Sequence, residues 1–346
     1  NSFEDNGIKL FAGDGTKLPD DVEFAIEEQL SKPISTVSPQ ALGKASRVTD
    51  AAGRYIEFCN SRIDTELKFN GLKIVLDCAQ GATYHIAPRV FEELGATVIS
   101  IGVSPNGLNI NENSGSMFPG LLVETVLKEK ADIGIAFDGD GDRVVMVDHL
   151  GNVVDGDEIL FVIASDRRRQ NVDFGGVVGT SMSNLGLEQA LDFLDIPFAR
   201  SAVGDRYVMR QLIERGWGLG GESSGHIICL DKTTTGDGIV SALQALSAIS
   251  RTERSLAELT SKLNKYPQSM VNVLVADSAD IIGSSLVQNA VADVESKLGS
   301  KGRVLLRPSG TEPVVRVMVE GEDAVEVLKL AQELAEVVEK EIGEPA

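Results

Sequence analysis

Residues 132–143 have the sequence Asp-Ile-Gly-Ile-Ala-Phe-Asp-Gly-Asp-Gly-Asp-Arg. The first six are a mainly apolar run that predicts a buried strand. The last six form a glycine-rich acidic turn that follows this strand directly. The carboxylates of Asp138, Asp140 and Asp142 can converge only if the backbone turns tightly, which the intervening glycines permit. Three hard oxygen donors of this kind suit Mg²⁺ or Ca²⁺.

Two other interpretations of this acidic turn fit less well. An EF-hand loop needs Gly at its sixth position and Glu at its twelfth, where this chain has Arg143 and His149. A solvated surface turn would leave three uncompensated carboxylates repelling one another at the end of a buried strand. The turn therefore predicts a divalent metal site.

Strands and helices alternate on both sides of this turn. The apolar runs predict strands at Leu72–Asp77, Thr97–Ile101, Asp132–Phe137, Gly176–Gly179, Phe198–Ser201 and Trp217–Gly220. Amphipathic runs between them predict helices at Ile86–Leu94, Leu121–Lys128, Asp157–Arg169, Leu185–Leu194, Arg206–Arg215 and Asp237–Ser250. This order is typical of two α/β units in series, each with a parallel sheet.

The two ends of the chain follow a different order. After Arg251 we expect a smaller α+β domain with an antiparallel sheet, because the predicted order changes to strand, helix, strand, strand, helix. The strands are predicted at Met270–Val275, Val304–Leu306 and Val314–Val319, and the helices at Ile281–Lys297 and Asp323–Lys340. Before Ala51 the sequence predicts only a turn into a short strand at Asn6–Phe11 and a helix at Pro19–Leu30. These two elements are too little to form a domain.

The composition is that of a globular protein with an acidic surface. Of the 346 residues, 42% are hydrophobic and 24% are charged, and the net charge is −20. Such a charge argues against a nucleic acid partner. No apolar run is as long as a membrane span, and the first residues are not those of a targeting peptide. We expect the three cysteines to be buried as small hydrophobic residues, and the protein to be cytoplasmic.

A polar loop lies at Gly221-Glu222-Ser223-Ser224-Gly225-His226. The Glu222 carboxylate and the Ser224 hydroxyl could bind vicinal sugar hydroxyls, although composition alone favours an ordinary glycine turn equally. The G-x-G-x-x-G pattern at 216–221 follows a helix instead of joining a strand to a helix, so we discount a dinucleotide site.

A second polar run, Arg-Pro-Ser-Gly-Thr-Glu-Pro at 307–313, is followed by Arg316. Its two guanidiniums, two hydroxyls and flexible glycine suit a dianionic phosphate. In so acidic a chain the run predicts a phosphate site, with a surface turn as the alternative. Lys9 has no distinguishing pattern by itself, and the three histidines have no metal-ligand spacing.

Together these runs resemble the signatures of the α-D-phosphohexomutase family. In order they are Asn-Gly-x-Lys at 6–9, Asp-Gly-Asp-Gly-Asp-Arg at 138–143, Gly-Glu-x-Ser-Gly-His at 221–226, and Arg-Pro-Ser-Gly-Thr-Glu-Pro at 307–313 with Arg316 downstream. Four signatures in the family's order make the resemblance specific, and it covers essentially the whole chain.

The resemblance implies an α/β, multidomain protein with one loop from each of four domains in a central cleft. Three mixed α/β domains, the first incomplete, would precede a smaller C-terminal α+β domain. The implied divisions are residues 1–50 for a remnant of the first domain, 51–155 with the metal loop, 156–263 with the sugar-binding loop, and 264–346 with the phosphate-binding loop.

Three stretches, at 106–111, 203–208 and 234–238, look most like the phosphoglucosamine mutase branch. That branch interconverts glucosamine 6-phosphate and glucosamine 1-phosphate through a phosphoserine enzyme and a sugar 1,6-bisphosphate, on the way to cell-wall amino-sugar precursors. The alternatives are a phosphomannomutase/phosphoglucomutase and a non-catalytic sugar-phosphate binding protein. The sequence leaves open whether the chain forms a homodimer.

The resemblance also implies roles for particular residues. One Mg²⁺ would bind Asp138, Asp140 and Asp142, and a sugar 1,6-bisphosphate would activate the intact enzyme. Lys9 and Arg143 would support the phosphoserine, with Lys9 as a general acid/base. The residues implied to bind the sugar and its non-reacting phosphate are Glu222, Ser224, His226, Arg307, Ser309, Gly310, Thr311 and Arg316.

One departure from the family's pattern is large. The family's phosphorylated serine lies ahead of the position that matches Asn1, and Ser2 stands where proline is usual. We therefore expect this chain to lack its nucleophile. As given, it should bind sugar phosphate but show no mutase turnover.

Overall fold

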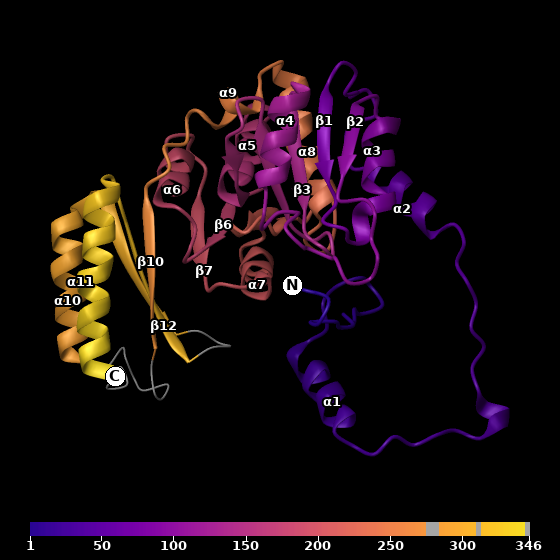
Figure 1. Ribbon diagram of the computed structural model, residues 1–346, viewed down its shortest axis with the longest axis horizontal. Helices are drawn as coiled ribbons and strands as arrows, with labels where there is room; N and C mark the ends of the chain where they lie inside the picture. The colour runs from indigo at the N-terminus through magenta and orange to yellow at the C-terminus, as the bar shows by residue number, and fades with distance from the viewer. Residues whose placement is uncertain (275–283, 309–312, 343–346) are drawn as a thin grey trace.

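A computed structural model describes residues 1–274, 284–308 and 313–342. Two α/β units with their own sheets form the main body, and a smaller C-terminal unit stands beside the second of them (Figure 1). The expected multidomain α/β class with a smaller α+β unit is confirmed. In the described part of the chain, no helix combines the length and the apolar character that a membrane crossing requires.

The first sheet has the strand order β2-β1-β3-β4-β5. Its strands are β1 Lys73–Asp77, β2 Thr97–Ile101, β3 Ile133–Phe137, β4 Val144–Asp148 and β5 Val153–Val154. The first three are parallel, as predicted, but β4 and β5 add an antiparallel edge that the sequence analysis missed. The sheet is therefore mixed, and the acidic turn is the hairpin between β3 and β4.

Helices cover both faces of this sheet. They are α2 Ala51–Asn60, the 3₁₀ helix η2 Ala82–His85, α3 Ala87–Glu93 and α4 Gly120–Glu129. Leu122 and Val126 of α4 pack against Val75, Ala136 and Val147 of the sheet. On the opposite side α3 packs on β2, and α2 packs on α3. Helix α2 was not predicted.

The second sheet has the order β7-β6-β8-β9. Its strands are β6 Val177–Thr180, β7 Phe198–Ser201, β8 Leu219–Gly221 and β9 Ile227–Cys229, and its helices are α5 Gly156–Arg169, α6 Leu185–Asp192, α7 Asp205–Arg215, α8 Gly238–Thr252 and α9 Leu256–Thr260. Here too the last strand is antiparallel, so this sheet is also mixed where a parallel one was expected.

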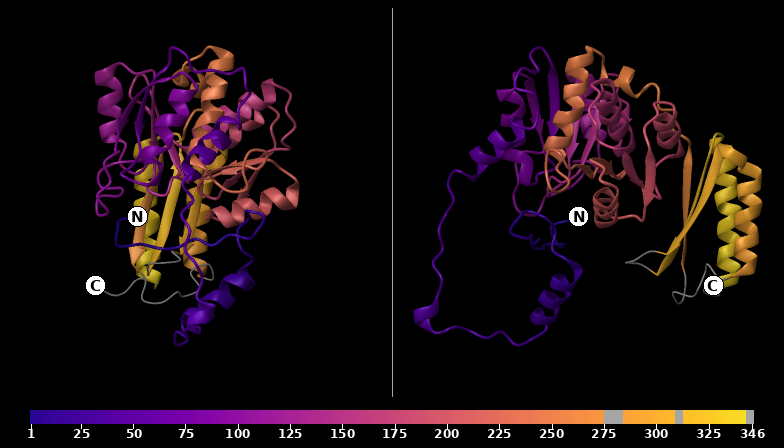
Figure 2. Two further views of the ribbon diagram at one scale, coloured as in Figure 1. Left: turned by 90° about the vertical axis from the view of Figure 1, so that its right-hand side faces the viewer. Right: turned by 180° about the vertical axis from the view of Figure 1, so that it is seen from behind.

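Helices α5 and α8 join the two α/β units. Helix α5 packs on β4 and β8, and α8 packs on β3, β4 and β9. Seen from behind, the orange α8 lies between the purple first unit and the pink second unit (Figure 2). Nearly every residue of α8 from Gly238 to Ile249 is buried, because the helix has protein on most of its surface. One continuous core of buried side chains consequently runs from Ile56 to Leu263.

The C-terminal unit has its own core. Its elements are β10 Gln268–Leu274, α10 Ser285–Leu298, the 3₁₀ helix η4 Gly299–Lys301, β11 Gly302–Pro308, β12 Val314–Gly321 and α11 Ala324–Ile342. The antiparallel sheet has the order β10-β12-β11, and both helices pack on one of its faces. The predicted β-α-β-β-α order is confirmed for the described residues; Val275 and residues 281–283 of the predicted elements lie outside them.

The first fifty residues contain no buried residue. They form α1 Asp20–Leu30 and the 3₁₀ helix η1 Pro39–Ala41. The predicted strand at Asn6–Phe11 was wrong, since a strand needs a partner and the only pairing in this segment is a single bridge between Phe11 and Lys17. The predicted helix is present.

Candidate active site

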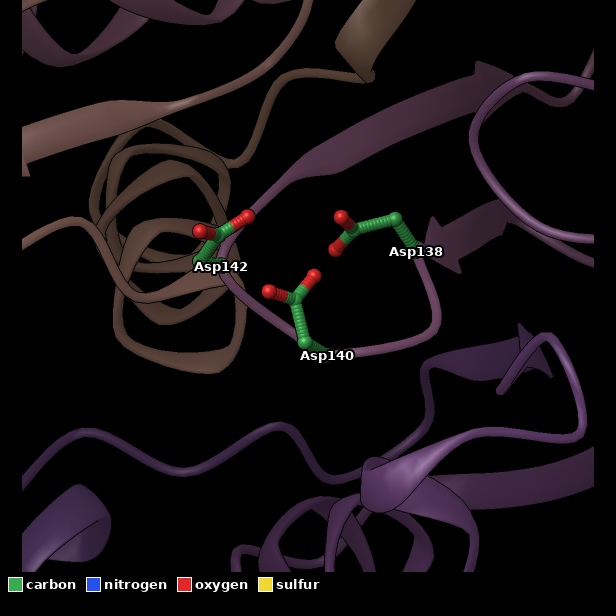
Figure 3. Close-up of side chains that lie close together, drawn as sticks. All are labelled: Asp138, Asp140 and Asp142. Atoms are coloured by element: carbon green, nitrogen blue, oxygen red, sulfur yellow. The ribbon is translucent and has the colours of Figure 1, made fainter. Parts of the chain in front are cut away.

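The acidic turn brings its three carboxylates together. One oxygen each from Asp138, Asp140 and Asp142 lies within 4.8 Å of the others, and the side chains of Asp138 and Asp140 turn toward one another inside the turn (Figure 3). Gly141 has φ +79°, a left-handed conformation that strains other residues, so a glycine is required for the turn.

Backbone hydrogen bonds fix the shape of this turn. Asp138 Oδ1 accepts from the N–H of Gly141 at 3.1 Å and from that of Arg143 at 3.0 Å. Burial, the hydrogen bond with Asp140 and the charges of Asp142 and Asp140 raise the pKa of Asp138 to about 7. Three carboxylates at this spacing therefore repel one another unless a cation lies among them.

The Lys9 ammonium is a cation in that position. It forms ion pairs with Asp140 and, at 3.1 Å, with Asp142. Burial opposes protonation of Lys9, but the two carboxylates outweigh it and raise its pKa above the usual value. Arg143 is less closely engaged, with Nε 4.0 Å from Asp142 Oδ1. The donor set and its need for positive charge fit a hard divalent cation such as Mg²⁺.

The loop 221–226 joins β8 to β9 and touches the acidic turn directly. The N–H of Val144 donates to the Gly225 carbonyl at 3.0 Å, and that of Gly156 donates to the Ser223 carbonyl at 3.1 Å. Gly225 has φ +93°, and a Cβ there would lie 2.1 Å from the Val144 carbonyl oxygen. The two loops, which come from different α/β units, are thus held against each other by backbone contacts between buried or half-buried residues.

The polar side chains of this loop have different surroundings. Glu222 is half-buried, and its Oε1 accepts from the N–H of Gly204 at 2.9 Å. The Ser224 hydroxyl is buried and has no hydrogen-bond partner within the described part of the chain. Glu222 thus keeps one carboxylate oxygen for a ligand, and Ser224 has an unused donor.

His226 lies behind the acidic turn and is only 4% exposed. Its Nδ1 is 3.6 Å from Asp142 Oδ2, and its Nε2 is 3.6 Å from Asp205 Oδ2. Burial acts to raise the pKa of Asp142, but hydrogen bonding and charge from His226 and Lys9 hold it below its usual range. Both ring nitrogens of His226 thus lie near carboxylates, and Nε2 is buried without a hydrogen-bond partner among the described residues. The role of His226 in substrate binding stays a prediction.

Arg307 and Arg316 face each other across β11 and β12, and both are half-buried. The Nε of Arg307 is buried without a hydrogen-bond partner among the described residues. Burial and the Arg316 charge lower the pKa of Arg307, whereas the Glu222 charge acts in the opposite direction. Arg307 is thus within electrostatic reach of the loop 221–226. Ser309, Gly310 and Thr311 lie outside the described residues.

A cavity of about 990 Å³ lies beside the acidic turn. The N-terminal segment, the loop around 108–118 and the acidic turn line it; among its lining residues are Asn1, Lys9, Ile110, Asn111, Phe118, Asp138 and Arg143. Asn111 fixes the N-terminal segment there, since its amide donates to the Asn1 carbonyl at 2.7 Å.

Two charged residues near the site, Asp205 and Lys17, were not predicted from the sequence. Asp205 lies against His226 and forms an ion pair with Lys17. Asp205 belongs to the stretch 203–208, which resembles the phosphoglucosamine mutase branch. That resemblance was the one feature of the sequence that could have pointed to Asp205. For Lys17 the sequence contains no signal, because the pair joins segments far apart in the chain.

Comparisons with known proteins identify relatives for most of the chain. Models of the phosphoglucomutase/phosphomannomutase family match residues 53–151 as alpha/beta/alpha domain II, 155–266 as alpha/beta/alpha domain III and 270–337 as the C-terminal domain. The phosphoglucosamine mutase of Aeromonas salmonicida (strain A449) is 60% identical over 98% of this chain and 76% of its own length. That of Erwinia tasmaniensis is also 60% identical, with the same shares covered, 98% and 76%.

Solved structures share the fold at lower identity. The putative phosphomannomutase from Thermus thermophilus has a TM-score of 0.72 at 21% identity, over 93% of this chain and 73% of that one. The Aspergillus fumigatus N-acetylphosphoglucosamine mutase, solved with GlcNAc-6P and magnesium, has a TM-score of 0.68 at 19% identity, over 82% of this chain and 69% of that one.

Proposed function

The chain belongs to the phosphoglucomutase/phosphomannomutase family, and on that premise we propose that it interconverts glucosamine 6-phosphate and glucosamine 1-phosphate. Relatives that are 60% identical over 98% of the chain are phosphoglucosamine mutases. The observation that carries the proposal is the convergence of Asp138, Asp140 and Asp142, whose carboxylate oxygens lie within 4.8 Å of one another.

The proposed ligands of one Mg²⁺ are these three carboxylates. When bound, the ion supplies positive charge to a phosphoryl group in transfer, a reaction that depends on positioning and charge neutralisation more than on covalent help from side chains. The ion pairs of Lys9 with Asp140 and Asp142 support this, because a cation is already stabilised there.

Lys9 and Arg143 are the proposed groups that orient the phosphoryl group. Their positive charges lie beside the carboxylates and line the same cavity. While Lys9 contacts Asp140 and Asp142, its raised pKa keeps it protonated. To act as the proposed general acid/base it must therefore leave these carboxylates, which a divalent ion on them would favour.

The remaining proposed residues hold the sugar and its other phosphate. Glu222 and Ser224 would bind sugar hydroxyls, and Arg307 and Arg316, together with Ser309, Gly310 and Thr311, would hold the non-reacting phosphate. A grip on both ends of the substrate lets a sugar 1,6-bisphosphate reorient and return its other phosphate to the enzyme. This bisphosphate is also the proposed activator.

The domain divisions at 51–155, 156–263 and 264–346 are proposed on the same basis, with residues 1–50 as part of a first domain. Each of the three has its own sheet, and α5 begins at Gly156. The proposed location is the cytoplasm, because all three cysteines are free and buried, as suits a reducing compartment.

The test is a coupled mutase assay with glucosamine, glucose and mannose 6-phosphates, Mg²⁺ and a sugar 1,6-bisphosphate. Because the resemblance places the phosphorylated serine ahead of Asn1, the assay uses these residues extended by the matching segment of the Aeromonas salmonicida relative. Faster turnover of glucosamine phosphate supports the proposal. Faster turnover of mannose or glucose phosphate favours the phosphomannomutase/phosphoglucomutase alternative, and binding without turnover favours a binding protein.

A further inference from the structure

A buried ion pair lies at one end of strands β11 and β12. Arg303 and Glu320 are directly opposite each other, and Arg303 Nε donates to Glu320 Oε2 at 2.5 Å. The Glu320 side chain is 0% exposed and that of Arg303 is 19% exposed. Burying two charges costs free energy that their attraction barely offsets, so further contacts must satisfy them.

These further contacts reach the second α/β unit. Arg303 donates to the carbonyl oxygens of Ser181 and Ser183, each at 2.6 Å. The backbone N–H of Leu185 donates to Glu320 Oε1 at 2.9 Å. The pair therefore bonds the C-terminal sheet to the segment 181–185 through three hydrogen bonds.

The segment that receives these bonds is itself firmly held. Arg200 donates to the same Ser183 carbonyl at 2.6 Å and is paired with Glu188 at 2.8 Å. The N–H of Asn184 donates to the buried Asp157 at 2.8 Å. The ion pair thus attaches the C-terminal sheet to a fixed point of the second unit.

The same two strands carry the proposed phosphate-binding arginines. Arg307 follows Arg303 by four residues on β11, and Arg316 precedes Glu320 by four on β12, so the two pairs are in register. An even spacing puts both pairs on one face of the sheet, roughly 13 Å apart along the strands. The helices α10 and α11 cover the other face.

We propose that Arg303 and Glu320 are positioning residues, which set where Arg307 and Arg316 stand relative to Glu222. The inference rests on the proposed function, because a sugar phosphate must contact the arginines and the loop 221–226 together. A ligand that bridges two sites gains the most affinity when the sites are held at the separation that the ligand spans. Inorganic phosphate contacts the arginines alone and gains nothing from that separation.

The test replaces the pair by apolar side chains in the double variant Arg303→Met/Glu320→Leu. Exchanging both partners together avoids leaving a buried unpaired charge, so the sheet should stay folded. Isothermal titration calorimetry without metal then compares glucosamine 6-phosphate with inorganic phosphate. We expect the affinity for the sugar phosphate to fall roughly tenfold or more, and the affinity for inorganic phosphate to stay unchanged. The control is Lys301→Ala, which removes an exposed pair with Glu322 at 3.0 Å on the same unit.

A second variant removes the contact from the other side. Leu185 is the first residue of α6, a position where proline is tolerated, and Asn184 has φ −60° and ψ 141°, which suit a following proline. Leu185→Pro therefore deletes the N–H that Glu320 accepts and leaves the C-terminal unit unaltered. Leu185→Ala is its control, since it loses the side chain but keeps the N–H. We expect only the proline variant to lose affinity for the sugar phosphate.

The outcomes separate this inference from the proposed function. If the unaltered chain binds both ligands and the folded variants retain the full preference for the sugar phosphate, the positioning role is wrong and the proposed function stands. If the double variant fails to fold, the test is the affinity of Leu185→Pro for glucosamine 6-phosphate and for inorganic phosphate, compared with that of Leu185→Ala. If the unaltered chain binds neither ligand, both proposals are overturned.

Discussion

Arg307 and Arg316 lie directly opposite each other on β11 and β12. Like charges at opposed positions destabilise an antiparallel pair. Burial and this neighbouring charge together lower the pKa of Arg307. The arrangement costs stability in the C-terminal sheet, and a dianion bound between the two guanidiniums would offset that cost.

We accordingly expect Arg307→Ala and Arg316→Ala to weaken sugar-phosphate binding without unfolding the unit. A charge-assisted hydrogen bond contributes about 1.5–3 kcal/mol, so each variant should lose roughly ten- to a hundredfold in affinity. Calorimetric titration with glucosamine 6-phosphate measures this. Lys297→Ala, on the exposed face of α10, is the control. Unchanged affinity in both variants would favour the surface-turn interpretation.

The carboxylates of the acidic turn should matter more for activity than for stability. Asp140→Asn removes a proposed ligand of Mg²⁺. It relieves the repulsion within the turn but also loses the exposed ion pair with Lys9. We expect a large loss of Mg²⁺ affinity and, in the extended polypeptide, of turnover. The unfolding midpoint should change little, because relief of the repulsion and loss of the ion pair oppose each other. Mg²⁺ titration and denaturant unfolding measure the two effects. Full turnover of the extended polypeptide without a divalent metal would contradict the metal site.

Lys9 should compete with the metal ion. Its ammonium contacts Asp140 and Asp142, the second at 3.1 Å, and must withdraw when a cation binds there. Lys9→Gln is therefore expected to bind Mg²⁺ more tightly than the unaltered chain and, in the extended polypeptide, to turn over more slowly. Lys17→Gln, which removes a pair with Asp205 instead, is the matched control. Weaker Mg²⁺ binding in Lys9→Gln would show that Lys9 helps to build the site.

Glu222→Gln should affect the sugar and spare the metal. The glutamine oxygen can still accept from the Gly204 N–H, so the loop keeps its shape, but a charged acceptor for sugar hydroxyls is lost. We expect weaker glucosamine 6-phosphate binding and unchanged Mg²⁺ affinity. Loss of Mg²⁺ binding would instead mean that the contact between Val144 and Gly225 transmits changes from one loop to the other.

The buried Asp157 should make the stability depend on pH. Burial and the charge of Asp155 raise its pKa to about 7, above the unfolded value of about 3.9. The folded state therefore binds this proton more tightly, and the contribution of Asp157 to stability decreases as the pH rises from about 4 to about 7. We compare the free energy of unfolding of the unaltered chain with that of Asp157→Asn. The advantage of the unaltered chain should be larger at pH 5 than at pH 8, by on the order of 1–3 kcal/mol. Asp195→Asn, at an exposed position, is the control.

The sequence predicts the elements whose pattern is local. Strand β3, the acidic turn after it and the C-terminal β-α-β-β-α order follow from apolar runs and glycines over a few residues. The buried state of Cys59, Cys78 and Cys229 was also expected and is confirmed. Strands β4 and β9 were missed because each is a short apolar segment directly after a polar loop. The polar loop was interpreted as a site, and the segment after it was not assigned to a strand.

Contacts between distant segments could not be predicted in this way. Lys9 and Asp142 are 133 residues apart, and only the family resemblance, not any local pattern, placed their loops in one cleft. Glu320 was likewise indistinguishable from any surface glutamate, although it is fully buried against Arg303. Such pairs depend on how the sheets pack, and no local pattern in the sequence encodes that packing.

The position of α8 has a consequence for synthesis of the protein on the ribosome. Strands β3 and β4 need this helix to cover one face, yet it begins only at Gly238. At roughly 5–20 residues per second, α8 emerges several seconds after β4. During that interval the nascent first sheet exposes apolar surface, and it completes its core only when the second unit has been made. A pause in translation between the two would lengthen the time during which the nascent chain can aggregate.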